Sequence, residues 1–348
     1  MIRRVQFNIS YANPGKLAKL DSIFDEAVRV INLYIDRLWQ LRRFSGSYVD
    51  FKVDTWLSAR MQQALGKQAL EIVKSQRRRR RKTKPVFKRT ALNLDSRFLD
   101  IRFDDNTFDV WFKLSSIGNR LSLKLPSKQH KHWHTLLRAG FTVKRSFRLR
   151  KTDSGYFIDL YVEKESPPQR AEGRDIAVDC GYKKLICTSD GEIIDEGLEQ
   201  CYEKISRKKQ GSKGFKRALR ERDNLINRSC KRLQLSDVRR LFAENLKNVK
   251  RNSKGRIRKS FNNKLQRWSY PKVLGKLSSL CEEFGIQFIL VNPAYTSQTC
   301  SLCGHVDRNS RQGEQFRCTC CKFVLDADIN AARNILHRGA YSPSAVPT

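Results

Sequence analysis

The sequence is short of acidic residues, and it lacks long apolar runs. It holds 35 Asp and Glu against 70 Lys and Arg, which gives a formal net charge of +35. No apolar run approaches the roughly 18 residues that a membrane-spanning helix needs. The first segment, MIRRVQFNISY, also lacks the apolar core of a signal peptide. This excess of positive charge predicts a polyanionic partner, with an acidic membrane surface or a ribosomal setting as alternatives.

Cysteine is absent from the first 179 residues, and all ten cysteines lie at position 180 or later. A secreted disulfide framework would be spread through the chain, so this distribution predicts a reducing compartment. Four of the ten form two C-x2-C pairs, Cys300 with Cys303 and Cys318 with Cys321, separated by fourteen residues. The pairs predict a structural zinc held by four thiolates, rather than buried or redox-active cysteines. Cys320 could compete with Cys321, but only Cys321 repeats the spacing of the first pair.

The first half of the chain changes its hydrophobic period along its length. Apolar residues recur at helical spacing from about 14 to 44 and again from about 53 to 75. Residues 1–12 and 91–165 instead alternate apolar and polar positions, as strands do. These patterns predict a β-rich body that carries a helical insertion. The polar segment 165–174, with its two prolines, is typical of a linker to the second half.

A cluster of positive charge follows the second helical segment. Between Gln76 and Thr90 nine residues are basic and none is acidic. We expect this run to contact nucleic acid, with a solvated tail or a nuclear import signal as the alternative. The candidate nucleic-acid-binding residues are Arg77, Arg78, Arg79, Arg80, Arg81, Lys82, Lys84 and Lys88.

Three acidic residues of the second half stand at unusual places. Asp179 ends one apolar, strand-like segment, and Glu244 ends another. Asp328 lies at the start of the last helical segment, just after Asp326, which we expect to cap that helix. A carboxylate at the end of a buried strand costs desolvation energy unless it binds a cation or a donor.

These three acids could converge on Mg²⁺, which favours a few carboxylates together with phosphate oxygens. Two such ions can stabilise the attacking and leaving oxygens in phosphodiester cleavage. Each acid taken singly also has a structural interpretation. Asp326 and Asp328 could simply be helix-start residues, and Glu244 could be the partner in a salt bridge.

Four segments of the second half resemble one protein family. In chain order they read AVDCGYKKLICTSDG, AENLKNV, LQRWSYPKVLGKLSSLCEEFGIQFILVNPAYTSQTCSLCGHVDRNSR and FRCTCCKFVLDADINAARNIL. They resemble the RuvC-like motifs and the zinc ribbon of TnpB, a family of transposon-associated, RNA-guided DNA endonucleases related to the miniature type V CRISPR nucleases. KPVFKR, residues 84–89, and the β-rich stretch after it also look like the family's N-terminal half.

The resemblance implies a multidomain fold, α/β plus β. It combines an N-terminal wedge-like β-barrel that carries a helical insertion with a C-terminal RNase H-like RuvC nuclease domain into which a zinc ribbon is inserted. The implied parts are the barrel at 1–13 and 85–167, the helical recognition insertion at 14–84, the nuclease domain at 168–293 and 323–338, the ribbon at 294–322, and a disordered tail at 339–348.

The resemblance also implies a function. Asp179, Glu244 and Asp328 would be catalytic and would hold two Mg²⁺ ions, while Zn²⁺ in the ribbon would be structural. A guide RNA would bind the N-terminal half, and pairing with that RNA would select the double-stranded DNA that is unwound and cut. The acid-free basic stretch from Asn245 to Cys281 would cover the nuclease groove as a lid.

Two alternatives to this function stay open. The first is an RNA-guided DNA-binding repressor that does not cleave, and the second is a miniature type V CRISPR effector. A cytoplasmic, nucleoid-associated location follows if the source is a prokaryote.

Overall fold

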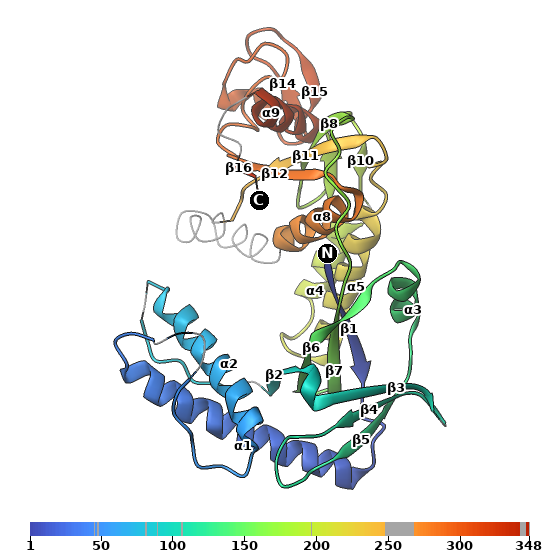
Figure 1. Cartoon of the computed structure of the whole chain (residues 1–348). Coiled ribbons are helices and arrows are strands. Elements are labelled where there is room, and N and C mark those ends of the chain that lie inside the picture. The colour runs from blue at the N-terminus through green and yellow to red at the C-terminus, as the bar shows by residue number, and fades with distance from the viewer. Residues whose placement is uncertain are drawn as a thin grey trace. The chain divides into compact units, whose positions relative to one another are not determined.

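The structure is a computed structural model of the chain, and it divides into two compact units, residues 1–165 and 166–348 (Figure 1). It describes residues 1–44, 46, 49–80, 82–88, 90–105, 107–195, 197–247, 268–341 and 346–347. The division after 165 falls two residues before the predicted boundary at 167 and lies within the proline-containing polar segment.

The first unit contains two long helices that pack against each other (Figure 1). Helix α1 spans Pro14–Gln40 and helix α2 spans Ala59–Arg77. Asn13 and Ser58 cap them, because each side chain accepts a hydrogen bond from an amide in the first helical turn. The second helix therefore begins at its cap, six residues later than its apolar spacing predicts.

Two antiparallel sheets complete the first unit, with strand orders β1-β7-β6-β2 and β3-β4-β5. The register places Val5 opposite Leu160 and Leu92 opposite Leu149, so apolar side chains of neighbouring strands share one face. The elements are β1 Ile2–Asn8, β2 Ala91–Asp95, η1 Ser96–Phe98, β3 Leu99–Asp105, β4 Phe108–Leu114, β5 Leu123–Ser127, α3 Lys131–Arg138, β6 Thr142–Thr152 and β7 Gly155–Glu163.

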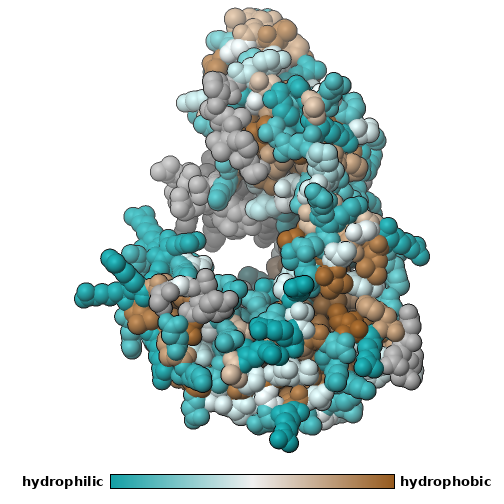
Figure 2. Space-filling model, in the orientation of Figure 1, coloured by the Kyte–Doolittle hydropathy of each residue, from teal (hydrophilic) through white to brown (hydrophobic). Residues whose placement is uncertain are grey.

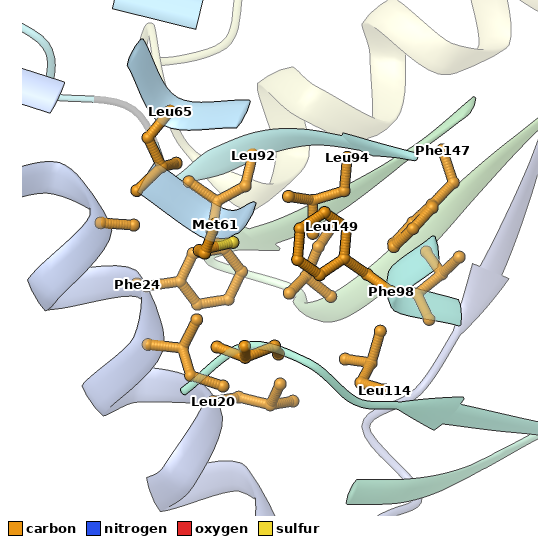
Figure 3. Close-up of a cluster of buried hydrophobic side chains, with 14 of the residues drawn as sticks. Leu20, Phe24, Met61, Leu65, Leu92, Leu94, Phe98, Leu114, Phe147 and Leu149 are labelled. Atoms are coloured by element: carbon orange, nitrogen blue, oxygen red, sulfur yellow. The ribbon is translucent and has the colours of Figure 1, made fainter. Parts of the chain in front are cut away.

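One hydrophobic core joins these helices to the sheets. Figure 3 shows Phe24 of α1 and Met61 of α2 beside Leu92 of β2 and Leu149 of β6, and all four side chains are buried. Burying a side chain of this size contributes about 1.5–3 kcal/mol. The two helices are therefore part of the same folded unit as the strands, although the chain inserts them between β1 and β2.

The second unit is built on a mixed six-stranded sheet of order β10-β9-β8-β11-β12-β16. Strands β8, β11 and β12 run parallel to one another, and β10, β9 and β16 pair antiparallel at the two sides. The strands are β8 Arg174–Asp179, β9 Ile186–Thr188, β10 Ile193–Ile194, β11 Val238–Glu244, β12 Gln287–Val291 and β16 Val346–Pro347.

Helices cover both faces of this sheet. Ile176 and Val178 of β8 pack in one core with residues of α4, α5 and α8, whereas Ala177 packs in another core with Ile335 of α9. This alternation follows from the strand's two-residue period. The helices are α4 Leu198–Ser206, α5 Lys213–Cys230, α8 Tyr270–Phe284 and α9 Ala327–Tyr341.

The end of the chain differs from the predicted tail at 339–348. Helix α9 continues to Tyr341, and Val346–Pro347 pairs with β12 as β16. Gly339 lets this part of the helix pack directly against the ring of Phe242, where a Cβ atom would clash. The segment after Glu244 that we expected to form a lid lies mostly outside the described residues, at 248–267.

A small three-stranded sheet, β13-β14-β15, precedes α9. Its strands are Arg311–Gln312, Gln315–Arg317 and Val324–Asp326, and the short helix η2, Arg308–Ser310, leads into it. Cys300, Phe316, Cys318 and Ala327 form its core. Because β15 ends at Asp326 and α9 begins at Ala327, this small sheet connects directly to the helix that carries Asp328.

The surface agrees with the composition of the chain. Hydrophilic residues cover most of the face seen in Figure 2. Among the described residues, no helix is long and apolar enough to cross a bilayer.

Candidate active site

Two of the three predicted acids lie side by side at one edge of the large sheet. In the parallel pair β8 and β11, Val178 lies opposite Ala243, and each strand ends with the next residue, Asp179 or Glu244. Asp179 shares its sheet face with Ala177, which contacts α9 residues in the core. The two carboxylates therefore end adjacent parallel strands at the carboxyl edge of the sheet, where open α/β sheets place their ligands.

Asp328 reaches the same place from α9. The Asp326 carboxylate caps this helix, because its Oδ1 accepts hydrogen bonds from the amides of Asp328, at 3.0 Å, and Ile329, at 3.2 Å. The expected cap is thus observed, and it leaves the Asp328 side chain available for other contacts. Asp328 is partly exposed and lines the same pocket as Asp179.

The electrostatics of the two strand-end acids reflect their burial and their charged neighbours. Enclosure of the Asp179 carboxyl, with the nearby charges of Glu244 and Asp328, raises its pKa to about 8. Burial also raises the pKa of Glu244, although a hydrogen bond from Thr296 and the charges of Arg338 and Arg311 act against it. Burial is the largest cause of both shifts, and a divalent cation bound beside the carboxylates would favour their charged forms.

Two basic residues, neither of them predicted, contact Asp328. Arg311 of β13 donates to its Oδ1 at 2.8 Å, and the Lys184 amine lies 3.8 Å from its Oδ2. Lys184 also forms an ion pair with Asp326. Burial lowers the pKa of Lys184, but its contacts with Asp326 and Asp328 raise it overall. Arg311 lines the pocket and Lys184 does not, so only the arginine stands where an incoming ligand would meet it.

Polar residues in the loop between β12 and the first cysteine pair support Glu244. The Thr296 hydroxyl donates a hydrogen bond to Glu244 Oε1. Two buried asparagines of α9 hold this loop: Asn334 donates to the carbonyl of Thr296 at 2.9 Å, and Asn330 donates to that of Thr299 at 2.8 Å. Asparagine is a poor residue inside a helix. Two of them four residues apart in DINAARNIL were therefore a signal that sequence reasoning missed.

The site opens into a pocket of about 450 Å³. Asp179 and Asp328 line it with the cations Lys183 and Arg311. Aromatic and other residues complete the wall, namely Cys180, Gly181, Tyr182, Glu199, Trp268, Gly313 and Glu314. A pocket lined by carboxylates, cations and aromatic rings is suited to a phosphate-bearing ligand that also has a flat apolar part.

The spacing of the acids indicates how many ions they could hold. The ligand atoms of Cys187, Asp326 and Asp328 all lie within 4.8 Å of one another, but the Lys184 amine already contacts both aspartates there. Asp179, Glu244 and Asp328, all among the described residues, do not form so tight a group. A single ion held by one oxygen from each of the three acids would require them to come closer together.

The four predicted thiols form the second candidate metal centre. Cys300, Cys303, Cys318 and Cys321 lie within 4.8 Å of one another. Sγ of Cys300 lies 3.7 Å from that of Cys321, and Sγ of Cys303 lies 3.6 Å from that of Cys318. Cys320 is exposed and outside the cluster, so the choice of Cys321 agrees with the structure. Such a cluster could bind a metal ion.

The predicted basic run divides into two kinds of residue. The Arg77 guanidinium donates to the carbonyls of Trp39, at 2.8 Å, and Leu38, at 3.2 Å, and packs over the Phe44 ring. It therefore joins α2 to the end of α1. Lys84 pairs with Asp36 at 2.9 Å. The side chains of Arg78, Arg79, Arg80, Lys82 and Lys88 are exposed, and Arg81 lies outside the described residues.

Comparison with known families identifies the C-terminal region. Residues 270–335 match the family model described as "Cas12f1-like, TNB domain". The chain is 46% identical over 72 residues to a CRISPR-associated endodeoxyribonuclease Cas12f1 of Sulfoacidibacillus thermotolerans, a match that covers 20% of this chain and 17% of that protein. It is 27% identical over 251 residues to a TnpB-like protein of Aquifex aeolicus, a match that covers 60% of this chain and 81% of that protein.

These matches confirm the predicted resemblance to TnpB-like proteins and their Cas12f1 relatives. The chain spans less than a fifth of the length of the Cas12f1 proteins that it matches. Among solved structures, one chain of a Cas12f1-sgRNA-target DNA complex superposes with a TM-score of 0.57 and 14% identity, covering 95% of this chain and 82% of that one. This likeness shows that the two chains share a fold.

Proposed function

We propose that this protein is an RNA-guided DNA endonuclease that cleaves phosphodiester bonds of target DNA by a two-metal mechanism. The observation that supports it is the meeting of three acids at one sheet edge, from β8, β11 and α9. Burial and the nearby charges of Glu244 and Asp328 raise the pKa of Asp179, so its charged form is destabilised in the metal-free protein. Bound cations would offset this cost, which is why we interpret the acids as metal ligands. Relatives named as endodeoxyribonucleases add to this support.

In this proposal Asp179, Glu244 and Asp328 are the magnesium ligands. When bound, Mg²⁺ would supply charge stabilisation to the attacking and leaving oxygens of an in-line displacement. The chain itself orients the ligands: Thr296 fixes one Glu244 oxygen, and Lys184 holds Asp328 from outside the pocket. Arg311 would exchange its contact with Asp328 for one with the substrate phosphate, because it lines the pocket and a bound cation would compete for the carboxylate.

We further assign the parts of the chain as the resemblance implies. The mixed sheet with α9 would be the RNase H-like RuvC core, and residues 294–322 would be a ribbon held by zinc. Zinc fits the donor set, because four thiolates at this spacing favour tetrahedral coordination. The two sheets of the first unit would be the wedge-like barrel, and 14–84 would be the recognition insertion.

The first unit would bind the guide RNA. Arg78, Arg79, Arg80, Lys82 and Lys88 are exposed and could contact its backbone. Arg77 donates hydrogen bonds to carbonyls at the end of α1, so we do not assign it to the RNA. Lys84 pairs with Asp36 only at the surface, where both side chains are half exposed, so it stays among the proposed RNA contacts. Target recognition would come from base pairing, which requires double-stranded DNA to be unwound before one strand enters the nuclease pocket.

An RNA-guided DNA-binding repressor without cleavage is the second candidate. The same RNA and DNA contacts would serve it, but it would not need three acids at one edge. A miniature type V CRISPR effector would share the chemistry proposed here. The genomic neighbourhood distinguishes that role from a transposon-encoded one, through a repeat array or a transposon end.

One experiment tests the proposal directly. The protein is purified with its bound RNA, the RNA is sequenced, and a plasmid carrying the matching target is incubated with the complex and Mg²⁺. We expect cleavage by the wild type and none by Asp179→Ala. Glu172→Gln, which changes an exposed acid of the same unit, is the matched control and should cleave normally.

Two results would contradict this function. Equal cleavage by wild type and Asp179→Ala would remove the carboxylates from the chemistry. Target binding by the complex without any cleavage, in Mg²⁺ or Mn²⁺, would favour the repressor.

A further inference from the structure

Two aromatic side chains line the same pocket as the acids. Tyr182 and Trp268 are both partly exposed, and they share the pocket with Asp179 and Asp328. Neither ring can coordinate Mg²⁺, and the cleavage chemistry proposed above gives neither of them a part. The presence of two aromatic rings on the wall of this pocket needs its own explanation. A partly exposed tryptophan gives up some of the stabilisation that full burial would provide.

Contacts with neighbouring residues fix the positions of both rings. The Trp268 indole donates a hydrogen bond to the carbonyl of Gly181 at 3.0 Å. The Tyr182 ring stacks on the buried ring of Tyr202, with centroids 4.6 Å apart. The Tyr202 hydroxyl in turn accepts a hydrogen bond from the amide of Ser269 at 3.0 Å. A ligand that stacked on these rings would not have to order them first.

The aromatic wall is fixed to both catalytic strands. Gly181, which anchors Trp268, comes two residues after Asp179 at the end of β8. Trp268 also packs with Tyr270, with centroids 5.0 Å apart, and the Tyr270 hydroxyl donates to the carbonyl of Glu244. The positions of the rings relative to the Asp179 and Glu244 carboxylates are therefore set by short covalent and hydrogen-bonded paths.

Trp268 also lines a second pocket, of about 300 Å³, on which apolar residues converge. Leu246, Leu274 and Leu290 line this second pocket together with Tyr270. The indole therefore borders one hollow that contains carboxylates and another that is largely apolar. A nucleotide has the same two characters, because its phosphate needs cations and its base offers flat apolar faces.

We propose that Trp268 and Tyr182 stack against a base of the DNA strand being cut, beside the scissile phosphate, and so position that phosphate at the three acids. This inference rests on the proposed function, which makes the carboxylate pocket a nuclease site. The ligand is a single strand, because a base in a duplex has both faces covered by its stacked neighbours. Stacking on a flat ring accepts every base, so this contact adds position without adding sequence preference.

The test combines a protein change with a DNA change. The cut position is mapped with the RNA-bound wild type, and target duplexes are then made with one abasic site at each nucleotide flanking the cut. Single-turnover cleavage is measured for wild type, Trp268→Ala and Trp268→Phe. On intact DNA we expect Trp268→Ala to be slower by roughly tenfold or more, the loss of one base–aromatic stack, and Trp268→Phe to keep most of the rate.

The interaction between the two changes decides the matter. If the base stacks on Trp268, an abasic site at one flanking position slows the wild type about as much as Trp268→Ala does, and it slows Trp268→Ala little further. If the indole only supports the fold, the two effects multiply at every position, and the inference is overturned. Thermal melts of the variants check that each one is folded.

A second readout does not depend on cleavage. In the Asp179→Ala complex, 2-aminopurine is placed in turn at each position of the cut strand, and its fluorescence reports stacking. We expect quenching at a position beside the cut that is lost when Trp268→Ala is added. Quenching without any cleavage by the wild type would support the stacking and overturn the nuclease proposal. Cleavage by the wild type without Trp268-dependent quenching would support the nuclease proposal and overturn the stacking.

Discussion

The thiol cluster and the acid pocket are both candidate metal centres, but the chain builds them in opposite ways. The four thiols come from residues 300–321 and are surrounded by a core of only a few side chains. The acids come from β8, β11 and α9, which are held by two large hydrophobic cores on the two faces of the sheet. Metal should therefore hold the ribbon together, whereas the acid pocket should fold without metal and at some cost in stability.

The largest expected effect tests the first half of this comparison. Cys318→Ser removes a thiolate from a cluster whose metal would supply most of the folding free energy of the ribbon, since structural zinc sites contribute on the order of 10 kcal/mol. We expect zinc to be lost from the purified protein, as measured by elemental analysis or native mass spectrometry. We also expect protease cleavage within 294–322.

Cys320→Ser is the matched control, because Cys320 is exposed and lies outside the cluster. It should retain one zinc per chain and resist protease as the wild type does. Zinc retained in Cys318→Ser and lost in Cys320→Ser would mean that the cluster uses a different fourth ligand.

The acid pocket should respond in the opposite direction. Asp179→Asn removes a metal ligand, and losing several kcal/mol of transition-state charge stabilisation would slow cleavage by about 10³-fold or more. The same change should stabilise the metal-free protein at neutral and alkaline pH, because it removes a carboxylate from a cluster of three. A variant that is inactive but more stable would demonstrate that this pocket is strained for function.

The pH dependence follows from the raised pKa of Asp179. This carboxyl titrates near 3.8 in the unfolded chain and at about 8 in the folded one, so between these values the folded state binds the extra proton. The contribution to stability is complete below pH 4 and is lost progressively as the pH rises from about 4 through 8, by on the order of 5 kcal/mol. Chemical denaturation of metal-free protein from pH 5 to 9 should show this slope, and it should flatten in Asp179→Asn. A parallel slope in both proteins would assign the effect to another group.

The thiol cluster can be predicted from the sequence more completely than the acid pocket. The four thiols are predictable because close spacing along the chain enforces proximity. Asp179 and Glu244 are predictable as strand ends, since parallel strands meet at one edge. Periodicity alone does not show that Asp328 joins them, because it begins a helix instead of ending a strand. The residues indicated only that the three acids could converge, and the resemblance to a family gave Asp328 its expected catalytic role.

The contacts around the acids could not be predicted, because each depends on chain segments that meet only in the fold. Arg311 and Lys184 reach Asp328 from β13 and from the turn after β8. Arg77 is the converse example. It stands in a run of basic residues, yet it contacts carbonyls at the end of α1, which lie far from it in sequence. Composition indicates charge in such a run but not which member has a partner.

A smaller effect should come from the cation behind the pocket. Lys184→Met removes the ammonium group that contacts Asp326 and Asp328 and leaves a side chain of similar length. Residues that orient metal ligands typically contribute 10- to 100-fold, so we expect cleavage about 10-fold slower and a higher Mg²⁺ concentration for half-maximal rate. The measurement is the rate as a function of Mg²⁺ concentration.

Lys204→Met is the matched control, because Lys204 pairs with Glu221 between α4 and α5 and both side chains are about half exposed, at 53% and 42%. Such surface pairs contribute little, so its Mg²⁺ dependence should be that of the wild type. An unchanged Mg²⁺ dependence in Lys184→Met would show that Asp328 is positioned without the lysine.

The smallest expected effect concerns backbone strain in the ribbon, at Lys322. Lys322 follows Cys321 with φ of 61°, a left-handed conformation that costs a residue with a Cβ about 1–2 kcal/mol. Lys322→Gly relieves this cost but gains conformational entropy in the unfolded chain worth about 0.5–1 kcal/mol, so the net stabilisation should be on the order of 0.5 kcal/mol. Lys322→Ala also loses the side-chain bond to the Thr319 carbonyl but keeps the Cβ, and it should gain nothing.

The midpoint of zinc removal by a chelator should therefore rise slightly for glycine relative to alanine. Equal midpoints would mean that the metal, rather than the backbone conformation, sets the stability of the ribbon, which is the stronger form of the contrast with the acid pocket.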